Sequence, residues 1–297
     1  MKVFVTGAAG FIGGSIAAGL VKAGHQVVGL VRNPDQVAEV AKIGVTGIVG
    51  TLADHDLLVA QARAADAVIN AASSDNRAAV EAIIEGLAGS GKPFLHTSGS
   101  SIVGDASAGL GTDKIYYEDQ LPEPTADKAA RVAIDNLVLA AAGQDVRSAV
   151  LCNTLIYGHG ALPRDSVQLP RLLKQAKKSG IVCHVGPGLN IWSNVHIDDV
   201  VDLYLLALEK SPAGTFYFVE SGEASFRDMS AAIARALGLG APQDWPLEEA
   251  KEEWGYEMAS YGLGSNSRVR GKNARELLGW QPHGPSVMDW IANDMLS

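Results

Sequence analysis

The amino-acid sequence predicts an α/β fold in which helices cover both faces of a doubly wound parallel sheet. Strand-like and helix-like stretches alternate through the first half of the chain, as βαβ units require. A glycine-rich turn at residues 6–13 joins a β-branched and aromatic run at 3–5 to apolar residues at helical spacing. After residue 157 prolines become denser and loop signals more frequent. We therefore expect a parallel-sheet domain followed by a smaller C-terminal lobe.

The expected elements follow one another in order. The helix after the glycine-rich turn stops at Gly24, and residues 26–31 form the second strand. Further strands are expected at residues 47–50, 67–72, 94–98 and 148–152, with helices at 57–65, 77–90 and 126–142. Later helices are expected at 167–178, 226–237 and 274–280, and a strand at 215–219. In a chain of 297 residues we predict a domain over 1–157 and a lobe over 158–297, with a segment near 192–208 returning to the first domain.

The glycine-rich turn reads Thr6-Gly7-Ala8-Ala9-Gly10-Phe11-Ile12-Gly13. Gly7 permits a tight turn, Gly10 lets a phosphate approach the backbone, and Gly13 lets the helix pack on the strand. The start of the helix offers free N–H groups and a partial positive charge. The turn therefore predicts a dinucleotide pyrophosphate site, to which we assign Gly7, Ala9, Gly10, Phe11, Ile12 and Gly13.

The spacing G-x-x-G-x-x-G in TGAAGFIG resembles the short-chain dehydrogenase/reductase superfamily, and in particular its extended and atypical branches. These branches include sugar-nucleotide epimerases, dihydroflavonol-type reductases and NADP-sensing relatives. The resemblance implies a Rossmann-type nucleotide-binding domain with a substrate-binding lobe. It also implies further cofactor contacts from the ends of later strands, namely Leu52, Ala71, Ala72, Ser73, Thr97, Lys128 and Asn153.

The end of the second strand favours NADP(H) over NAD(H). An acidic residue there would bind the ribose hydroxyls of NAD, but the strand ends Val31-Arg32-Asn33-Pro34. The planar guanidinium of Arg32 suits a 2′-phosphate. The alternative is that Arg32 only stacks on the adenine, which NAD would also allow.

The catalytic residues that the resemblance implies are incomplete. The superfamily uses a serine, a tyrosine and a lysine, with tyrosine and lysine spaced Y-x-x-x-K. Lys128 lies where the lysine is expected, but Pro124 occupies the tyrosine position. The serine position falls on Gly99, between Ser98 and Ser100.

Three interpretations of this departure stay open. In the first, Tyr116 or Tyr117, in the loop expected over the nicotinamide, supplies the proton that the missing tyrosine would give to the substrate. Alternatively, Ser98, Ser100 or water is a weaker donor. Finally, the protein binds NADP(H) without turnover.

Two later segments resemble parts of the same family that lie near substrate. Residues 149–160 resemble the stretch that closes over the nicotinamide, and residues 192–200 resemble the extended branch's "v-H-v-D-D-v". On this basis Tyr157, Trp192 and His196 are candidate substrate residues, although His196 is equally suited to a structural hydrogen bond. We expect Cys152 to be a small buried residue, because no cation is evident beside it.

Composition narrows the classes of partner. A net charge of −9 without a basic stripe disfavours nucleic acid, and no apolar run is long enough for a membrane span. The two cysteines give no disulfide framework and no signal peptide precedes the first strand, so we expect a cytoplasmic protein. The histidines lack metal-ligand spacing, and neither G-x-S-x-G nor a P-loop is present. We expect a small-molecule substrate, no metal, and a monomer or homodimer.

Taken together, these features predict an oxidoreductase that uses NADPH to reduce a small carbonyl compound, or that oxidises the alcohol. A sugar-nucleotide-type epimerase or dehydratase, and a non-catalytic NADP(H)-binding sensor, are the alternatives.

Overall fold

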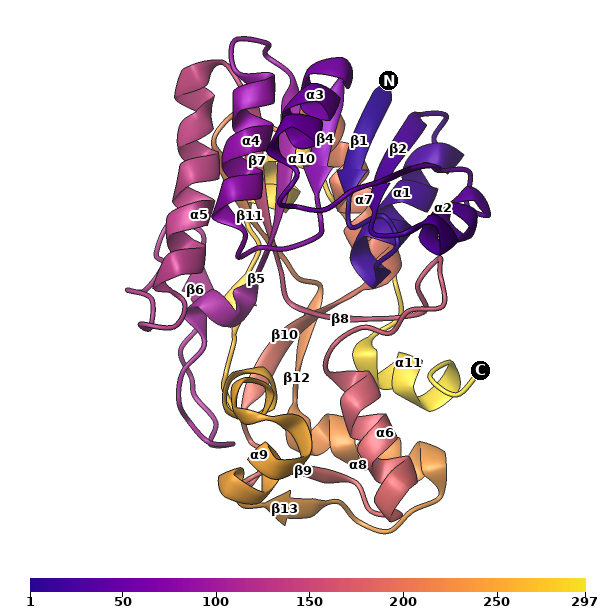
Figure 1. Cartoon of the computed structure of the whole chain (residues 1–297). Coiled ribbons are helices and arrows are strands. Elements are labelled where there is room, and N and C mark those ends of the chain that lie inside the picture. The colour runs from indigo at the N-terminus through magenta and orange to yellow at the C-terminus, as the bar shows by residue number, and fades with distance from the viewer.

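A computed structural model describes all residues 1–297. Its centre is a sheet of seven parallel strands in the order β11-β7-β5-β4-β1-β2-β3 (Figure 1). The order reverses between β1 and β4, which places a ligand crevice at the carboxyl ends of these strands. The strands are β1 (Lys2–Thr6), β2 (Gln26–Val31), β3 (Thr46–Val49), β4 (Ala67–Asn70), β5 (Pro93–Gly99), β7 (Arg147–Asn153) and β11 (Thr215–Val219). The predicted Rossmann-type α/β fold is confirmed.

Helices cover both faces of this sheet. One face packs against a core shared by α1 (Phe11–Lys22), α2 (Pro34–Ala41), α7 (Ile197–Lys210) and α10 (Asn273–Leu278). The other packs against α3 (His55–Ala64), α4 (Arg77–Leu87) and α5 (Ala129–Ala140), which is followed by the 3₁₀ turn η2 (Ala141–Gln144). The strands of such a sheet are buried on both sides, which explains their continuous apolar runs.

The second lobe has its own core and lies below the sheet in Figure 1. A three-stranded sheet has the order β12-β10-β8, and β9 pairs with β13. The strands of the lobe are β8 (Leu155–Tyr157), β9 (Cys183–Val185), β10 (Ile191–His196), β12 (Gly222–Ser225) and β13 (Gln243–Trp245). The helices are α6 (Leu169–Ser179), α8 (Phe226–Leu237), α9 (Leu247–Trp254), α11 (Val287–Asn293) and the π-helical segment η3 (Met258–Leu263).

Local signals explain where these helices begin and end. The Ser225 hydroxyl accepts the N–H of Asp228 at 3.0 Å and caps α8, and Gly238 ends that helix at φ +67°. By contrast, Gly10 precedes α1 without any side-chain cap. The first N–H groups of α1 are therefore free for a ligand.

The return of the chain to the first domain is larger than predicted. The segment expected near 192–208 is divided, because β10 belongs to the second lobe whereas α7 packs against α1. Strand β11, which follows α7, forms the edge of the central sheet, whereas the sequence predicts that its residues belong to the second lobe. After residue 157 the chain therefore passes between the first domain and the second lobe more than once.

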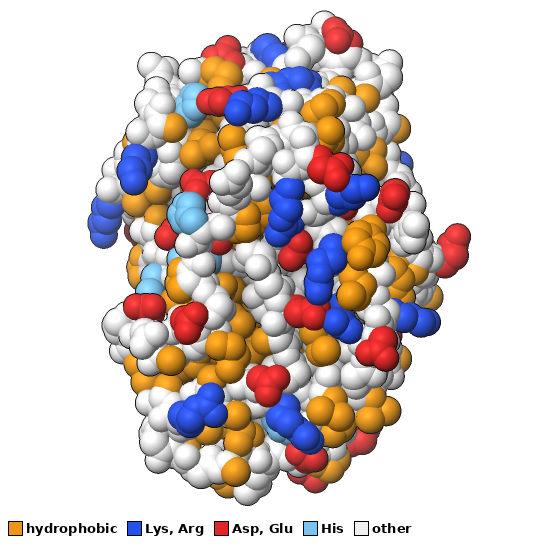
Figure 2. All heavy atoms as spheres, turned by 180° about the vertical axis from the view of Figure 1, so that it is seen from behind, with side chains coloured by type: hydrophobic (Ala, Val, Ile, Leu, Met, Phe, Trp, Pro, Cys, Tyr) orange, Lys and Arg blue, Asp and Glu red, His pale blue; other side chains and the backbone are white.

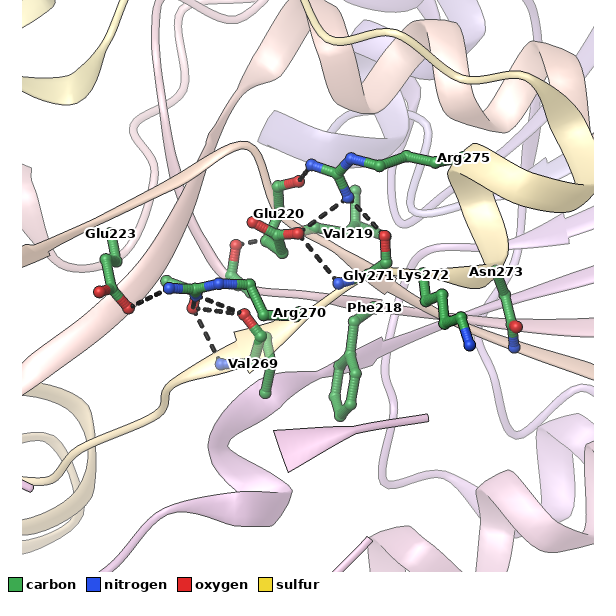
Figure 3. A network of polar contacts seen from close by, with 12 residues as sticks. Phe218, Val219, Glu220, Glu223, Val269, Arg270, Gly271, Lys272, Asn273 and Arg275 are labelled. Atoms are coloured by element: carbon green, nitrogen blue, oxygen red, sulfur yellow. Dashed lines mark hydrogen bonds and ion pairs between the residues drawn. The ribbon is translucent and has the colours of Figure 1, made fainter. Parts of the chain in front are cut away.

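A polar clamp of Glu220, Arg275, Glu223 and Arg270 holds the end of β11 against the last part of the chain (Figure 3). The buried Glu220 carboxylate accepts the Gly271 N–H at 2.9 Å and Arg275 Nη1 at 2.8 Å. Burial raises the pKa of Glu220. Beside it, Arg270 Nη2 lies 3.0 Å from Glu223 Oε2. The clamp fixes β14 (Val269–Arg270) and α10 to the central sheet.

The surface bears both signs of charge. Figure 2 shows basic and acidic side chains interspersed over one face of the molecule. None of the helices combines the length and the apolar character needed to cross a bilayer.

Candidate functional site

The first cavity lies at the carboxyl ends of β1, β2 and β4, where the strand order reverses, and has a volume of about 420 Å³. Seven of the predicted cofactor residues line it: Gly7, Ala9, Gly10, Arg32, Leu52, Ala71 and Ala72. The remaining lining comes from the ends of β2 and β3, from Gln36 of α2 and from Arg164.

The glycines of the turn have the steric roles that their spacing predicts. Gly7 has φ +70°, and a Cβ there would lie 2.7 Å from the Ala71 carbonyl oxygen. A Cβ on Gly13 would collide with the Gly7 carbonyl. Phe11, Ile12 and Gly13 form the first turn of α1 and do not line the cavity, so the backbone at Gly7 to Gly10 forms its floor.

Arg32 lies at the mouth of the first cavity. Its side chain is exposed and makes no ion pair, while its backbone N–H donates to Gln36 Oε1 at 2.9 Å. No carboxylate lines this cavity. At the end of β3, Asp54 is turned aside and accepts the Thr51 N–H at 2.6 Å.

The second cavity lies between the carboxyl ends of β5 and β7 and the second lobe, with a volume of about 610 Å³. Five stretches of chain meet there: residues 99–101, the start of α5, residues 153–154, residues 167–171 and residues 254–262, together with Trp192. Two of the predicted catalytic residues, Ser100 and Lys128, line it, and so does Asn153.

Lys128 is buried at the start of α5, with 4% of its surface exposed. Its Nζ lies 3.1 Å from Asp127 Oδ2, 3.3 Å from Glu257 Oε1 and 5.3 Å from the centre of the Tyr261 ring. Carboxylates and an aromatic face are both favourable neighbours for an ammonium group. Lys128 is thus a cavity residue rather than an exposed helix lysine.

The two candidate serines are separated. Ser98 is buried below the cavity and donates to Asp135 Oδ2 at 2.8 Å. Ser100 lines the second cavity, and its Oγ accepts the Ser267 hydroxyl at 2.7 Å. Only Ser100 is in a position to meet a ligand in that cavity.

The structure does not bring Tyr116 or Tyr117 to either cavity. They form β6 (Tyr116–Tyr117), which pairs with β14, and Tyr116 packs against the core beneath the central sheet. The sequence-based expectation placed them in an irregular loop over the cofactor. A parallel pairing with a strand more than a hundred residues later in the chain overrides that expectation.

Asn153 and Thr97 are joined through Tyr204 of α7. The Tyr204 hydroxyl lies 2.8 Å from Thr97 Oγ1 and accepts Asn153 Nδ2 at 3.1 Å. Burial raises the pKa of Tyr204 to about 12, so it stays protonated. Asn153 Oδ1 is buried without a partner, which leaves an acceptor at the cavity wall. Thr97 lies below the cavity, and Ser73 forms the turn after β4 by accepting the Asp75 N–H.

Of the three predicted substrate residues, only Trp192 lines the second cavity. The Tyr157 hydroxyl donates to the Pro285 carbonyl at 2.7 Å, and its ring packs edge-on against His196. His196 Nδ1 accepts the Asp198 N–H and caps α7. Both residues therefore hold the second lobe together, in agreement with the structural alternative for His196.

A chain of buried polar groups runs under the second cavity. Asn70 Nδ2 lies 3.0 Å from His96 Nδ1, and His96 Nε2 faces Asp135 Oδ1 at 3.8 Å. Burial lowers the pKa of His96 to about 4 and raises that of Asp135 to about 7. The neighbouring Cys152 is fully buried and burial raises its pKa, as expected for a thiol that is not a nucleophile.

Sequence reasoning missed the aromatic wall of the second cavity. Trp254, Tyr256 and Tyr261 line it from the end of α9 and from η3. Three aromatic residues within eight positions of a loop-rich lobe indicate a candidate binding surface. No strand or helix pattern in the sequence, however, predicts that this surface faces the central sheet.

The glycine turn, the crevice at the strand-order reversal and the second cavity beside it define a nucleotide-cofactor-binding α/β protein. The chain belongs to the NAD dependent epimerase/dehydratase family, which it matches over residues 3–219.

Relatives of known sequence and structure agree with this membership. An uncharacterized protein of Schizosaccharomyces pombe is 32% identical over 99% of both chains. The 2-alkyl-3-oxoalkanoate reductase of Stenotrophomonas maltophilia is 30% identical over 80% of this chain and 76% of its own. The structure of UDP-glucuronic acid 4-epimerase from Bacillus cereus, in complex with UDP-glucuronic acid and NAD, matches with a TM-score of 0.77 at 20% identity, over 98% of this chain and 96% of that one.

Proposed function

We propose that this protein is an NADPH-dependent reductase of a small carbonyl compound, or equally the dehydrogenase of the corresponding alcohol. The observation that carries the proposal is the buried Lys128, held beside the Tyr261 ring in a cavity at the end of the cofactor strands. The name of the oxoalkanoate reductase supports a reduction rather than an epimerisation.

The two cavities fit the two ends of the cofactor. The uncapped start of α1 and the floor at Gly7 to Gly10 suit the pyrophosphate, and Arg32 suits a 2′-phosphate. At the other end, the unpartnered Asn153 Oδ1 is an acceptor for the nicotinamide carboxamide. NADPH preference rests on Arg32 and on the lack of a carboxylate in the first cavity.

A bound NADPH supplies the hydride that reduces the carbonyl carbon. The carbonyl oxygen then needs a proton, and Pro124 cannot give one. We assign this role to the Tyr261 phenol, which the second lobe contributes to the cavity that holds Lys128. A hydrogen bond with Tyr256 raises the pKa of Tyr261. The Lys128 ammonium beside the ring stabilises the phenolate that remains.

The size and lining of the second cavity favour a small substrate with apolar or aromatic character. Trp192, Trp254 and Met258 supply contact area, and Ser100 is placed to donate a hydrogen bond to the substrate oxygen. UDP-glucuronic acid, which the Bacillus cereus epimerase binds, is the test case for the epimerase alternative.

Turnover assays test the proposal directly. The purified protein is incubated with NADPH and a panel of 3-oxo acids, ketones and aldehydes, and the absorbance of the reduced cofactor is followed. Consumption of NADPH with at least one class supports a reductase. Interconversion of sugar nucleotides without net cofactor consumption identifies an epimerase. Tight NADPH binding without any turnover identifies the sensor. The Asp127 and Glu257 carboxylates already pair with Lys128, and this pairing favours the sensor over an enzyme.

A further inference from the structure

A loop of the second lobe contributes Arg164 to the first cavity. This loop, residues 158–166, crosses the start of α1, where the Ala161 N–H donates to Ser15 Oγ at 3.2 Å. A Cβ on Gly160 would lie 2.8 Å from the Phe11 ring, and one on Gly14 would lie 3.1 Å from Leu162. The loop is therefore packed closely onto the helix that begins the dinucleotide site.

From this loop Arg164 reaches across to α2. Its Nη2 lies 2.7 Å from Glu39 Oε2. Glu39 lies one turn after Gln36, which lines the first cavity together with Arg32 and Arg164. Arg164 thus lies on the α2 side of the first cavity.

The charge of this cavity is unusual for the protein. The chain has a net charge of −9, yet the charged side chains that line the first cavity are two arginines and no carboxylate. Arg32 has no ion-pair partner, and Arg164 has only the carboxylate of Glu39, whose side chain is 18% exposed. Two guanidinium groups at one end of a nucleotide cavity suit a phosphate dianion, because each offers a planar pair of donors.

We propose that Arg164 is a second, specificity-determining residue for the 2′-phosphate of NADP(H), supplied by the substrate lobe. This inference rests on the proposed cofactor preference. In the free protein Glu39 neutralises Arg164. The 2′-phosphate takes over Arg164 on binding, and Arg32 holds the phosphate from the other side.

Calorimetric titration with NADP⁺ and NAD⁺ tests the assignment. We expect Arg164→Ala to weaken NADP⁺ binding by about 10-fold or more, equivalent to about 1.4 kcal/mol, and NAD⁺ binding by less than about twofold. Arg235→Ala, an exposed arginine of the same lobe that lines neither cavity, is the matched control and should change neither.

Glu39→Gln separates a phosphate contact from a loop-holding role. If Arg164 binds phosphate, removing its competitor keeps or tightens NADP⁺ binding. If the ion pair only positions the loop, Glu39→Gln weakens NADP⁺ as much as Arg164→Ala does, and the proposal is wrong. An equal loss for both cofactors in Arg164→Ala also overturns it, by placing the side chain on the shared pyrophosphate.

The outcome for the wild type distinguishes the two proposals. A wild type that binds NAD⁺ more tightly than NADP⁺ contradicts the proposed cofactor preference and this inference with it. A wild type that prefers NADP⁺ and loses that preference in Arg32→Ala but not in Arg164→Ala contradicts this inference alone.

Discussion

The two cavities are built in different ways from the same sheet. The first is made largely by the backbone of one βαβ unit and the ends of two further strands, and its glycines act by having no side chain. The second is made by side chains from five separate stretches of chain. A cavity shaped by local backbone is specified by a short motif, whereas a cavity shaped by distant side chains is specified only by the complete fold.

Gly13→Val is expected to have the largest effect, because it tests the backbone-built cavity at its tightest contact. A branched side chain would meet the Gly7 carbonyl and force α1 away from β1. We expect loss of measurable binding of both cofactors by calorimetry, with a lower melting temperature. Gly240→Ala is the control, since its Cβ would enter open space. Binding within about tenfold of wild type would show that the helix–strand contact tolerates a side chain at Gly13.

Tyr261→Phe tests the side-chain-built cavity. The ring and its contact with Lys128 remain but the proton is lost, so turnover should fall by about 100-fold or more with NADPH binding unchanged. Tyr116→Phe and Tyr117→Phe, which line neither cavity, should turn over like wild type. A large loss of turnover in either of these variants, with none in Tyr261→Phe, would identify Tyr116 or Tyr117 as the proton donor.

Arg32→Ala separates two kinds of contact in the first cavity. Some contacts are shared by all dinucleotides, and others are specific to the 2′-phosphate of NADP(H). Loss of a charge-assisted contact should weaken NADP⁺ by about 10- to 100-fold. NAD⁺ should change much less, and Arg235→Ala should change neither. Equal losses for both cofactors would mean that Arg32 contacts the adenine rather than a 2′-phosphate.

Asp135→Asn addresses the buried polar groups beneath the second cavity and acts on stability rather than on ligand binding. The native pKa of Asp135 is about 7, above that of an unfolded aspartate, so the native state holds a proton that the unfolded state releases. Wild-type stability is therefore penalised increasingly as pH rises from about 4 to about 7. The variant lacks this penalty, so its free energy of unfolding relative to wild type should rise over that window, by at most about 1.4 kcal/mol per pH unit.

Urea unfolding at a series of pH values measures this difference. His96 has the opposite sign, because its lowered pKa makes wild-type stability rise with pH up to its unfolded value. Asp119→Asn, at an exposed position, is the control for the change of residue type. A difference that does not vary with pH for Asp135→Asn would refute the buried-proton interpretation.

The elements with strong periodicity were predictable to the residue. Strand β2, strand β11 and helix α8 have the bounds that the sequence indicated. Helix α2 was not predicted, although Asn33 caps it by accepting the Gln36 N–H and Pro34 occupies its first turn. The helix has only 8 residues and follows β2 closely, so its periodic pattern is weak.

The site was predictable only where backbone geometry makes it. Gly7 and Gly13 were identified because the turn and the helix–strand packing each exclude a Cβ, and Gly10 because a phosphate is expected to approach the backbone there. Tyr261 and Arg164 were not, because nothing near them in the sequence states that the second lobe folds back over the strand ends. Tyr116 was expected near the cofactor for the same reason, because its partner strand β14 lies near the end of the chain and its pairing is not visible in the local sequence.

The late position of β11 in the chain has a consequence for biosynthesis. During translation β1 to β7 emerge first, but β7 stays an unpaired edge until residues 215–219 leave the ribosome. An exposed apolar edge strand is a template for wrong pairing, so a nascent chain paused after residue 157 presents such an edge. The clamp at Glu220 closes later still, once Arg275 has been made. The nucleotide domain is therefore completed among the last events of synthesis, although its signature motif is among the first residues translated.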